Sequence, residues 1–146
     1  MAGRFNILVC SACVILIYSF SYGQKHNKPE IESAMHRYDH FIQKMDADSI
    51  ALMYSPDGDL GEIAHGRDSI RKFLLTFKNV KVLSQSSVTD SIQLNGDSAI
   101  QYGSYKQMAV INEKDTARLK GTYTAKWIWL PTEGWRMKKM NTKPQN

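Results

Sequence analysis

The order in which hydrophobic patterns occur along the chain limits its fold more than any other feature. From Ile31 to Phe77 apolar residues recur at the spacing of helices, whereas after Asn79 they alternate with polar residues. A period near 3.6 predicts amphipathic helices, and a period of two predicts half-buried strands. The chain is therefore expected to form three short helices followed by a sheet, with the helices covering one face of that sheet.

The first predicted helix has a start signal and a single apolar stripe. Asn27 can cap it, Pro29 suits its first turn, and Glu30 can complete a capping box. At about 100° per residue, Tyr38 lies within roughly 20° of the centre of the stripe, so its hydroxyl is expected to enter the interior. The stripe consists of Ile31, Ala34, Met35, Tyr38, Phe41, Ile42 and Met45.

His36 and His40 lie four residues apart on this helix, which is a spacing found in paired metal ligands. By the same helical geometry they point about 160° away from the stripe, and the sequence offers no evident third ligand. They are therefore expected to face solvent, and no metal site is predicted. The chain also has no phosphate loop or nucleophile arrangement, so no cofactor is predicted.

Two further helices are expected before the sheet. Asp46 or Asp48 can cap a second helix over 49–54, and Pro56-Asp57-Gly58 is predicted to end it as a turn. A third helix is predicted to open at His65-Gly66-Arg67. Its apolar positions are Ile70, Phe73, Leu74 and Phe77.

The second half of the chain predicts four consecutive strands. Asn95-Gly96 is a strong hairpin signal, and Pro131 to Gly134 marks another turn. Short connections of this kind join antiparallel neighbours, so the fold class is α+β, with three N-terminal helices on one face of a curved antiparallel sheet. The first strand pattern includes Val80, Val82, Ile92 and Leu94, and the other three lie over 99–111, 119–129 and 135–140.

The first 23 residues predict a signal peptide. Arg4 precedes an apolar run from Ile7 to Tyr18, and Ser21-Tyr22-Gly23 supplies small residues before a new start at Gln24. The run is shorter than the roughly 20 apolar residues of a transmembrane helix, although an uncleaved anchor or a lipoprotein at Cys13 is an alternative. Residues 24–146 are then one secreted or periplasmic domain without a stable membrane anchor, and its first residues, 24–28, are expected to be a frayed lead-in.

Composition narrows the possible partners. Cys10 and Cys13, which are the only cysteines, both fall in the predicted signal peptide, so the mature domain cannot use disulfides. The net charge is +5, but the basic residues are scattered among acidic ones. This interleaving and the export signal argue against a nucleic-acid partner and favour a solubilising surface.

With these elements in place, the chain resembles the nuclear transport factor 2-like superfamily, also called the SnoaL-like or ketosteroid-isomerase-like fold. This resemblance covers nearly all of the mature chain. It implies a cone-shaped domain with a pocket between the helices and the sheet, and often a homodimer through the outer face of the sheet. The residues that carry it are Arg37-Tyr38, 46–54 with Pro56-Asp57, 65–73, Gly121-Thr122-Tyr123, and Trp127 with Gly134-Trp135.

The resemblance also implies candidate catalytic residues. Tyr38 falls on the oxyanion-hole tyrosine of the steroid isomerases, and Glu62 falls on their general-base carboxylate. His65 is expected at the mouth of the cone, where it could act as an acid or a base. Ala125 occupies the position at which those enzymes keep a protonated aspartic acid, so one oxyanion donor is missing.

Three functions remain open on the sequence alone. The domain could bind a small apolar or carbonyl-containing molecule, it could be an isomerase, dehydratase or cyclase that uses Glu62 or His65, or it could be an interaction module whose cone its own side chains fill. For each pocket residue a purely structural role in the core or on the surface is the alternative. The predicted pocket residues are Tyr54, Tyr105, Tyr123, Ala125 and Trp127.

Overall fold

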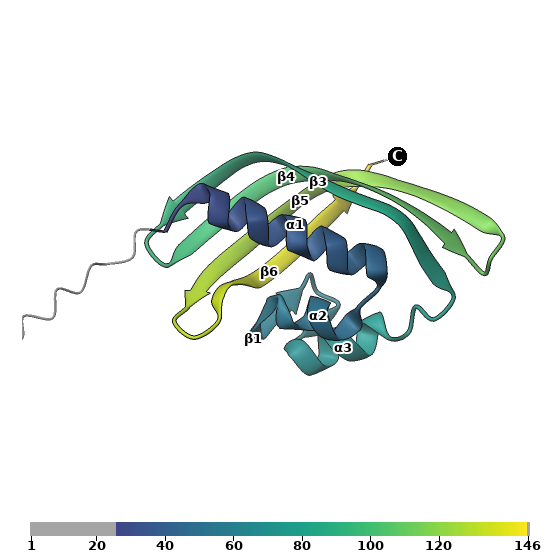
Figure 1. Cartoon of the computed structure of the whole chain (residues 1–146), viewed down its shortest axis with the longest axis horizontal. Coiled ribbons are helices and arrows are strands. Elements are labelled where there is room, and N and C mark those ends of the chain that lie inside the picture. Colours follow the sequence, from purple (N-terminus) through teal and green to yellow (C-terminus); the bar gives the residue numbers. More distant parts are fainter. Residues whose placement is uncertain (1–25, 146) are drawn as a thin grey trace, which may run out of the picture.

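The computed structural model describes residues 26–145, so the predicted signal peptide with its two cysteines lies outside the described residues. Figure 1 shows a curved sheet with α1 lying along it, and α2, α3 and β1 gathered near the end of α1. The helices are α1 (Lys28–Lys44), α2 (Ala47–Leu52) and α3 (Arg67–Leu74). The strands are β1 (Tyr54–Leu60), β2 (Ala64–His65), β3 (Val80–Asn95), β4 (Ser98–Ile111), β5 (Asp115–Leu130) and β6 (Gly134–Pro144).

The α+β class is confirmed, but the prediction of a wholly antiparallel sheet is wrong. The six strands run in the order β2-β1-β6-β5-β4-β3. Neighbours pair antiparallel from β3 to β6, as the short turns predict, whereas β1 pairs parallel with β6. Because β1 and β6 are far apart in the sequence, no hairpin signal announces their pairing, and the sheet is mixed.

The predicted turn at Pro56-Asp57-Gly58 is also wrong, because these residues lie inside β1. The register between β1 and β6 shifts from Tyr54 opposite Met137 to Asp59 opposite Lys139, so the intervening residues form an irregularity in the strand. Proline and glycine are tolerated in strands at such irregularities. Gly58 is required there, since a Cβ would lie 2.8 Å from the carbonyl oxygen of Met137.

The helix starts are built largely as the sequence predicts. The Oδ1 atom of Asn27 accepts a hydrogen bond from the backbone N–H of Glu30, and Oδ1 of Asp46 accepts one from Ser49. The reciprocal half of the capping box is replaced, because Oε2 of Glu30 accepts a hydrogen bond from Nε1 of Trp135 at 3.0 Å. Glu30 thus ties the start of α1 to β6.

The lead-in to α1 is packed at His26, contrary to the expectation of fraying. The ring of His26 is buried and lies 4.1 Å from the ring of Trp129, centroid to centroid. Its Nε2 atom is 3.2 Å from Oδ1 of Asp97. The contact with Trp129 buries the imidazole of His26, while its Nε2 atom remains next to the carboxylate of Asp97.

The core lies between α1 and the concave face of the sheet, and the long strands curve around it (Figure 1). Two glycines allow tyrosine rings to cross a neighbouring strand. A Cβ on Gly103 would lie 2.6 Å from the ring of Tyr123, and one on Gly121 would lie 2.9 Å from the ring of Tyr105.

Within residues 26–145, no helix has the length and apolar character to cross a membrane.

Candidate functional site

A cleft of about 480 Å³ lies between α1, α3, the β1–β2 turn and the inner face of the sheet. Apolar and aromatic side chains form most of its wall, among them Met35, Ile42, Leu60, Phe73 and Met140. Concave sites with mainly apolar walls and a few polar groups are typical of small-molecule binding. The polar residues in the wall are Gln85, Ser87 and Gln107 on β3 and β4, with Thr142 on β6.

Tyr38 lies on the wall of this cleft, as its central place on the apolar stripe predicts. Its phenol oxygen is 3.2 Å from that of Tyr54, and the two rings meet edge to face. Tyr38 is 8% exposed and Tyr54 is fully buried. Burial raises the pKa of Tyr38 to about 12 and raises that of Tyr54 well above its usual value. Both phenols are therefore protonated at neutral pH.

Tyr105 and Tyr123 also line the cleft, whereas Tyr54, Ala125 and Trp127 do not. The hydroxyl of Tyr123 is buried and has no hydrogen-bond partner among the described residues. Tyr54, Ala125 and Trp127 lie in the core behind the wall, with exposures of at most 1%. The Nε1 atom of Trp127 donates a hydrogen bond to Oε1 of Gln101 at 3.0 Å, which satisfies its polar group away from the cleft.

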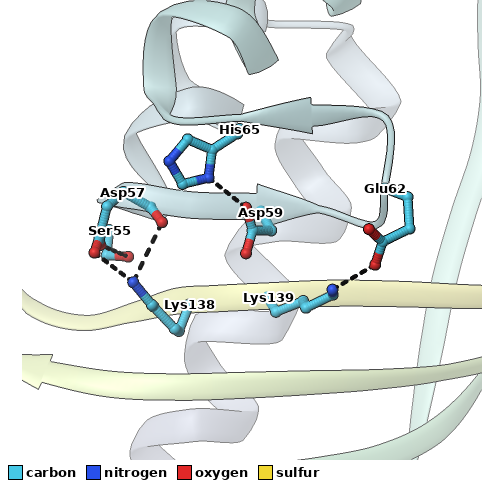
Figure 2. Close-up of polar contacts among 7 residues, drawn as sticks. All are labelled: Ser55, Asp57, Asp59, Glu62, His65, Lys138 and Lys139. Carbon is cyan, nitrogen blue, oxygen red and sulfur yellow. Dashed lines mark hydrogen bonds and ion pairs between the residues drawn. The ribbon is translucent and has the colours of Figure 1, made fainter.

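Glu62 and His65 are not among the residues that line the cleft, and Figure 2 shows both beside polar side chains of β1 and β6. The side chain of Glu62 is 89% exposed and accepts a hydrogen bond from Nζ of Lys139 at 2.6 Å. The ring of His65 is 74% exposed, and its Nδ1 atom lies 2.6 Å from Oδ1 of Asp59. The hydrogen bond from His65 lowers the pKa of the Asp59 carboxyl. The structure therefore does not bring Glu62 and His65 together with Tyr38.

The surface around Glu62 and His65 is a band of opposite charges between β1 and β6 (Figure 2). Lys138 pairs with the carboxylate of Asp57, which also accepts a hydrogen bond from Ser55 at 3.1 Å. These contacts lower the pKa of Asp57. The pairs join two strands that run parallel at this edge of the sheet, so each charge in the band already has a partner.

A buried carboxylate behind the cleft is the main feature that sequence analysis missed. Asp39 is 6% exposed. It follows the buried Tyr38 on α1, and the residues that flank this pair, Arg37 and His40, are exposed. Its oxygens accept hydrogen bonds from the backbone N–H and the hydroxyl of Ser87 and from Nε2 of Gln85. The only signal in the sequence is a run of polar residues in β3, which is unusual for a strand that faces a core.

The described residues contain no group of three histidines, cysteines or acidic side chains that could hold a metal ion. His36 and His40 are both exposed on α1. The polar groups of the cleft are phenols, amides and hydroxyls, which suit hydrogen bonding to an organic molecule.

Comparison with known proteins finds similarity in structure alone. No protein-family model matches the chain, and no curated protein matches it by sequence. A ketosteroid isomerase-like protein from Erwinia carotovora atroseptica matches with a TM-score of 0.70 and 17% identity, over 80% of this chain and 94% of that one. A nuclear transport factor 2-like superfamily protein from Salmonella enterica matches with a TM-score of 0.67 and 19% identity, over 81% and 90%.

ActVI-ORFA from Streptomyces coelicolor matches with a TM-score of 0.67 and 13% identity, over 80% of this chain and 96% of that one. At such low identities the similarity establishes the arrangement of helices and strands and no particular activity. The resemblance seen in the sequence is confirmed at this level: the chain has the fold of the ketosteroid isomerase-like and nuclear transport factor 2-like proteins.

Proposed function

We propose that this domain binds a small, largely apolar molecule with a carbonyl group in the cleft and does not catalyse a reaction on it. The observation that carries the proposal is the cleft itself, whose apolar wall includes the protonated phenol of Tyr38. A cleft of about 480 Å³ falls in the range of 300–1,000 Å³ that is common for ligand sites.

The pair of phenols gives Tyr38 a defined role in binding. The phenol oxygens of Tyr38 and Tyr54 are 3.2 Å apart. When Tyr54 donates to Tyr38, the proton of Tyr38 is free to be donated to a ligand. A carbonyl oxygen is the simplest acceptor that can enter an apolar cleft, because it carries no charge and needs only one donor to offset its desolvation.

Binding is favoured over catalysis because neither of the bases that the resemblance implies lines the cleft. Glu62, the base that the resemblance implies, is 89% exposed and bonded to Lys139. His65 is 74% exposed and bonded to Asp59. A general base must come within about 2.6–3.2 Å of the proton that it removes, and neither side chain lines the cleft.

Export after cleavage at Gln24 and homodimer formation through the outer face of the sheet are also parts of this proposal. Intact-mass measurement tests the cleavage, and sedimentation tests the homodimer.

The binding proposal is tested with a naphthyl ketone dye, 6-propionyl-2-(dimethylamino)naphthalene, whose emission shifts to the blue in apolar surroundings. The wild-type domain should bind one dye per chain in a saturable manner. Ile42→Trp should fill the cleft, because Ile42 is part of its wall, and should abolish binding. Leu52→Trp adds the same ring on α2 at a side chain that is 57% exposed and outside the cleft wall, so it should bind like the wild type.

The proposal fails if the wild type shows no saturable binding, or if Ile42→Trp binds the dye as well as Leu52→Trp does. Circular dichroism melts of both variants show whether each one is folded. Native mass spectrometry of the purified wild type then looks for a molecule that is retained from the host, which should be absent from Ile42→Trp.

A further inference from the structure

The carboxylate of Asp39 is buried without a positively charged partner. It is 6% exposed, and it forms no salt bridge with any residue in 26–145. Its three hydrogen bonds come from neutral groups on β3, at 2.7 Å from the Ser87 hydroxyl, 2.8 Å from the Ser87 N–H and 3.0 Å from Gln85. Such bonds satisfy the oxygens but leave the negative charge uncompensated.

The charge of Asp39 sets the direction of two amide side chains. An ionised carboxylate only accepts hydrogen bonds, so Gln85 must turn Nε2 toward Asp39. The Oε1 atom of Gln85 then accepts a hydrogen bond from Nε2 of Gln107 at 3.1 Å. The Gln107 carbonyl is therefore the far end of a chain of hydrogen bonds that starts at Asp39.

This chain carries negative potential to the wall of the cleft. In the side-chain amides of Gln85 and Gln107, the N–H end points toward Asp39 and the carbonyl end points away from it. Hydrogen bonds aligned in this way strengthen one another. Gln85, Ser87 and Gln107 all line the cleft. The Oε1 atom of Gln107 accepts no hydrogen bond from the part of the chain that the structure describes.

Two phenols in the same wall respond to this charge. Burial is the main reason that the pKa values of Tyr38 and Tyr123 are raised, and the negative charge of Asp39 raises them further. Asp39 thus disfavours a second negative charge in the cleft. An incoming carboxylate would meet the same repulsion in the same low-dielectric surroundings.

From this arrangement we infer that the cleft selects ligands with a hydrogen-bond donor, a hydroxyl or a protonated amine, received by the carbonyl of Gln107, and rejects carboxylates. The inference rests on the proposed binding function and adds the chemical class of the ligand. The molecule that fits is largely apolar, carries a carbonyl group for Tyr38 and carries a separate donor for Gln107.

Three probes that share one ring system test the selection. They are 2-(aminomethyl)naphthalene, 2-naphthalenemethanol and 2-naphthoate, and each competes with the ketone dye at about 0.15 M salt. The amine and the alcohol should bind roughly ten- to a hundredfold more tightly than the carboxylate, as expected for hydrogen bonds to charged or polarised groups. The chain as a whole carries a net charge of +5, so non-specific attraction to its surface predicts the opposite order.

Variants test whether Asp39 and Gln107, at the two ends of the series of hydrogen bonds, cause this selection. Asp39→Asn keeps the size of the side chain and removes its charge, so it should lower the preference for the amine over the carboxylate at least tenfold. Gln107→Leu should lower the affinity for the alcohol about tenfold more than it lowers the affinity for the ketone dye, which has no donor for the Gln107 carbonyl. Asp115→Asn removes an exposed charge at the start of β5 and should leave the order of the probes unchanged.

The outcomes separate this inference from the function on which it rests. If the dye binds but the carboxylate competes as well as the amine, or if both variants keep the wild-type preference, the selection is wrong and the binding function stands. If the dye does not bind, both fail. Should Asp39→Asn not fold, the wild-type order of probes and the Gln107→Leu variant decide.

Discussion

The phenol oxygens of Tyr38 and Tyr54 face each other at 3.2 Å, where neither residue is more than 8% exposed. Tyr38→Phe should lower the free energy of unfolding by about 1–3 kcal/mol, because it leaves the buried Tyr54 hydroxyl without this partner. Tyr54→Phe should have a similar cost, and the double variant should cost less than the sum of the two. Urea denaturation of the four proteins measures the coupling, and additive costs would contradict it.

The same pair predicts a loss of stability at alkaline pH. The pKa of Tyr38 is about 12 in the folded protein, against about 10 in an unfolded chain. Below pH 10 both states hold the proton, so the contribution of Tyr38 is fully present. Between pH 10 and 12 the unfolded state releases the proton first, and roughly 2–3 kcal/mol of stability should be lost.

Comparison of the wild type with the double variant Tyr38→Phe, Tyr54→Phe isolates this effect, because all other titrating groups are shared. The wild type should lose more stability between pH 10 and 12 than the variant. Parallel slopes in the two proteins would show that these phenols titrate alike in the folded and unfolded states.

Gly103→Ala should be strongly destabilising. A Cβ at this position would lie 2.2 Å from the carbonyl oxygen of Val88 and 2.6 Å from the ring of Tyr123. Backbone cannot move aside without disturbing the pairing of β3 with β4, so we expect a loss of more than about 2 kcal/mol. Gly96→Asn is the control. A Cβ at position 96 would have no atom within 4 Å, and the φ of +55° there is one that asparagine tolerates. Equal melting temperatures for the two variants would contradict the close approach.

Sequence patterns were sufficient for the parts of the fold that depend on local signals. The caps at Asn27 and Asp46, the apolar stripe through Tyr38 and the hairpin at Asn95-Gly96 are all found where they were predicted. Pairings between distant segments have no such signal. The strand β1 pairs in parallel with β6, which is the last strand of the chain. That pairing makes the predicted turn at Pro56 part of a strand.

The cleft shows the same division between local and distant signals. Helical periodicity predicts that Tyr38 faces the interior, and the structure buries this residue. The position of Glu62 depends on the short turn between β1 and β2, which directs its carboxylate to Lys139. Asp39 could not be predicted as buried, since its partners Gln85 and Ser87 lie 46 and 48 residues further along the chain.

The outward position of Glu62 predicts that the protein is a poor steroid isomerase. Efficient proton transfer next to a carbonyl needs a base and an oxyanion donor on the same substrate. Tyr38 can supply one donor from the cleft wall, but the Glu62 side chain is 89% exposed and Ala125, which is fully buried, provides no second donor. The loss of a single donor of this kind typically costs about 10²–10³ in rate, and the absence of a positioned base adds to it.

The measurement is the turnover of a β,γ-unsaturated ketosteroid, followed by the absorbance of the conjugated product. We expect a rate at least about 10³-fold below that of an efficient enzyme. We also expect measurable competition between the steroid and the ketone dye, because a ketone can enter the apolar cleft and accept a hydrogen bond from Tyr38 without any base. Tyr38→Phe should weaken this competition. Turnover that approaches the diffusion limit would show that a base reaches the cleft in solution, and Glu62→Gln and His65→Gln would then identify which side chain moves inward.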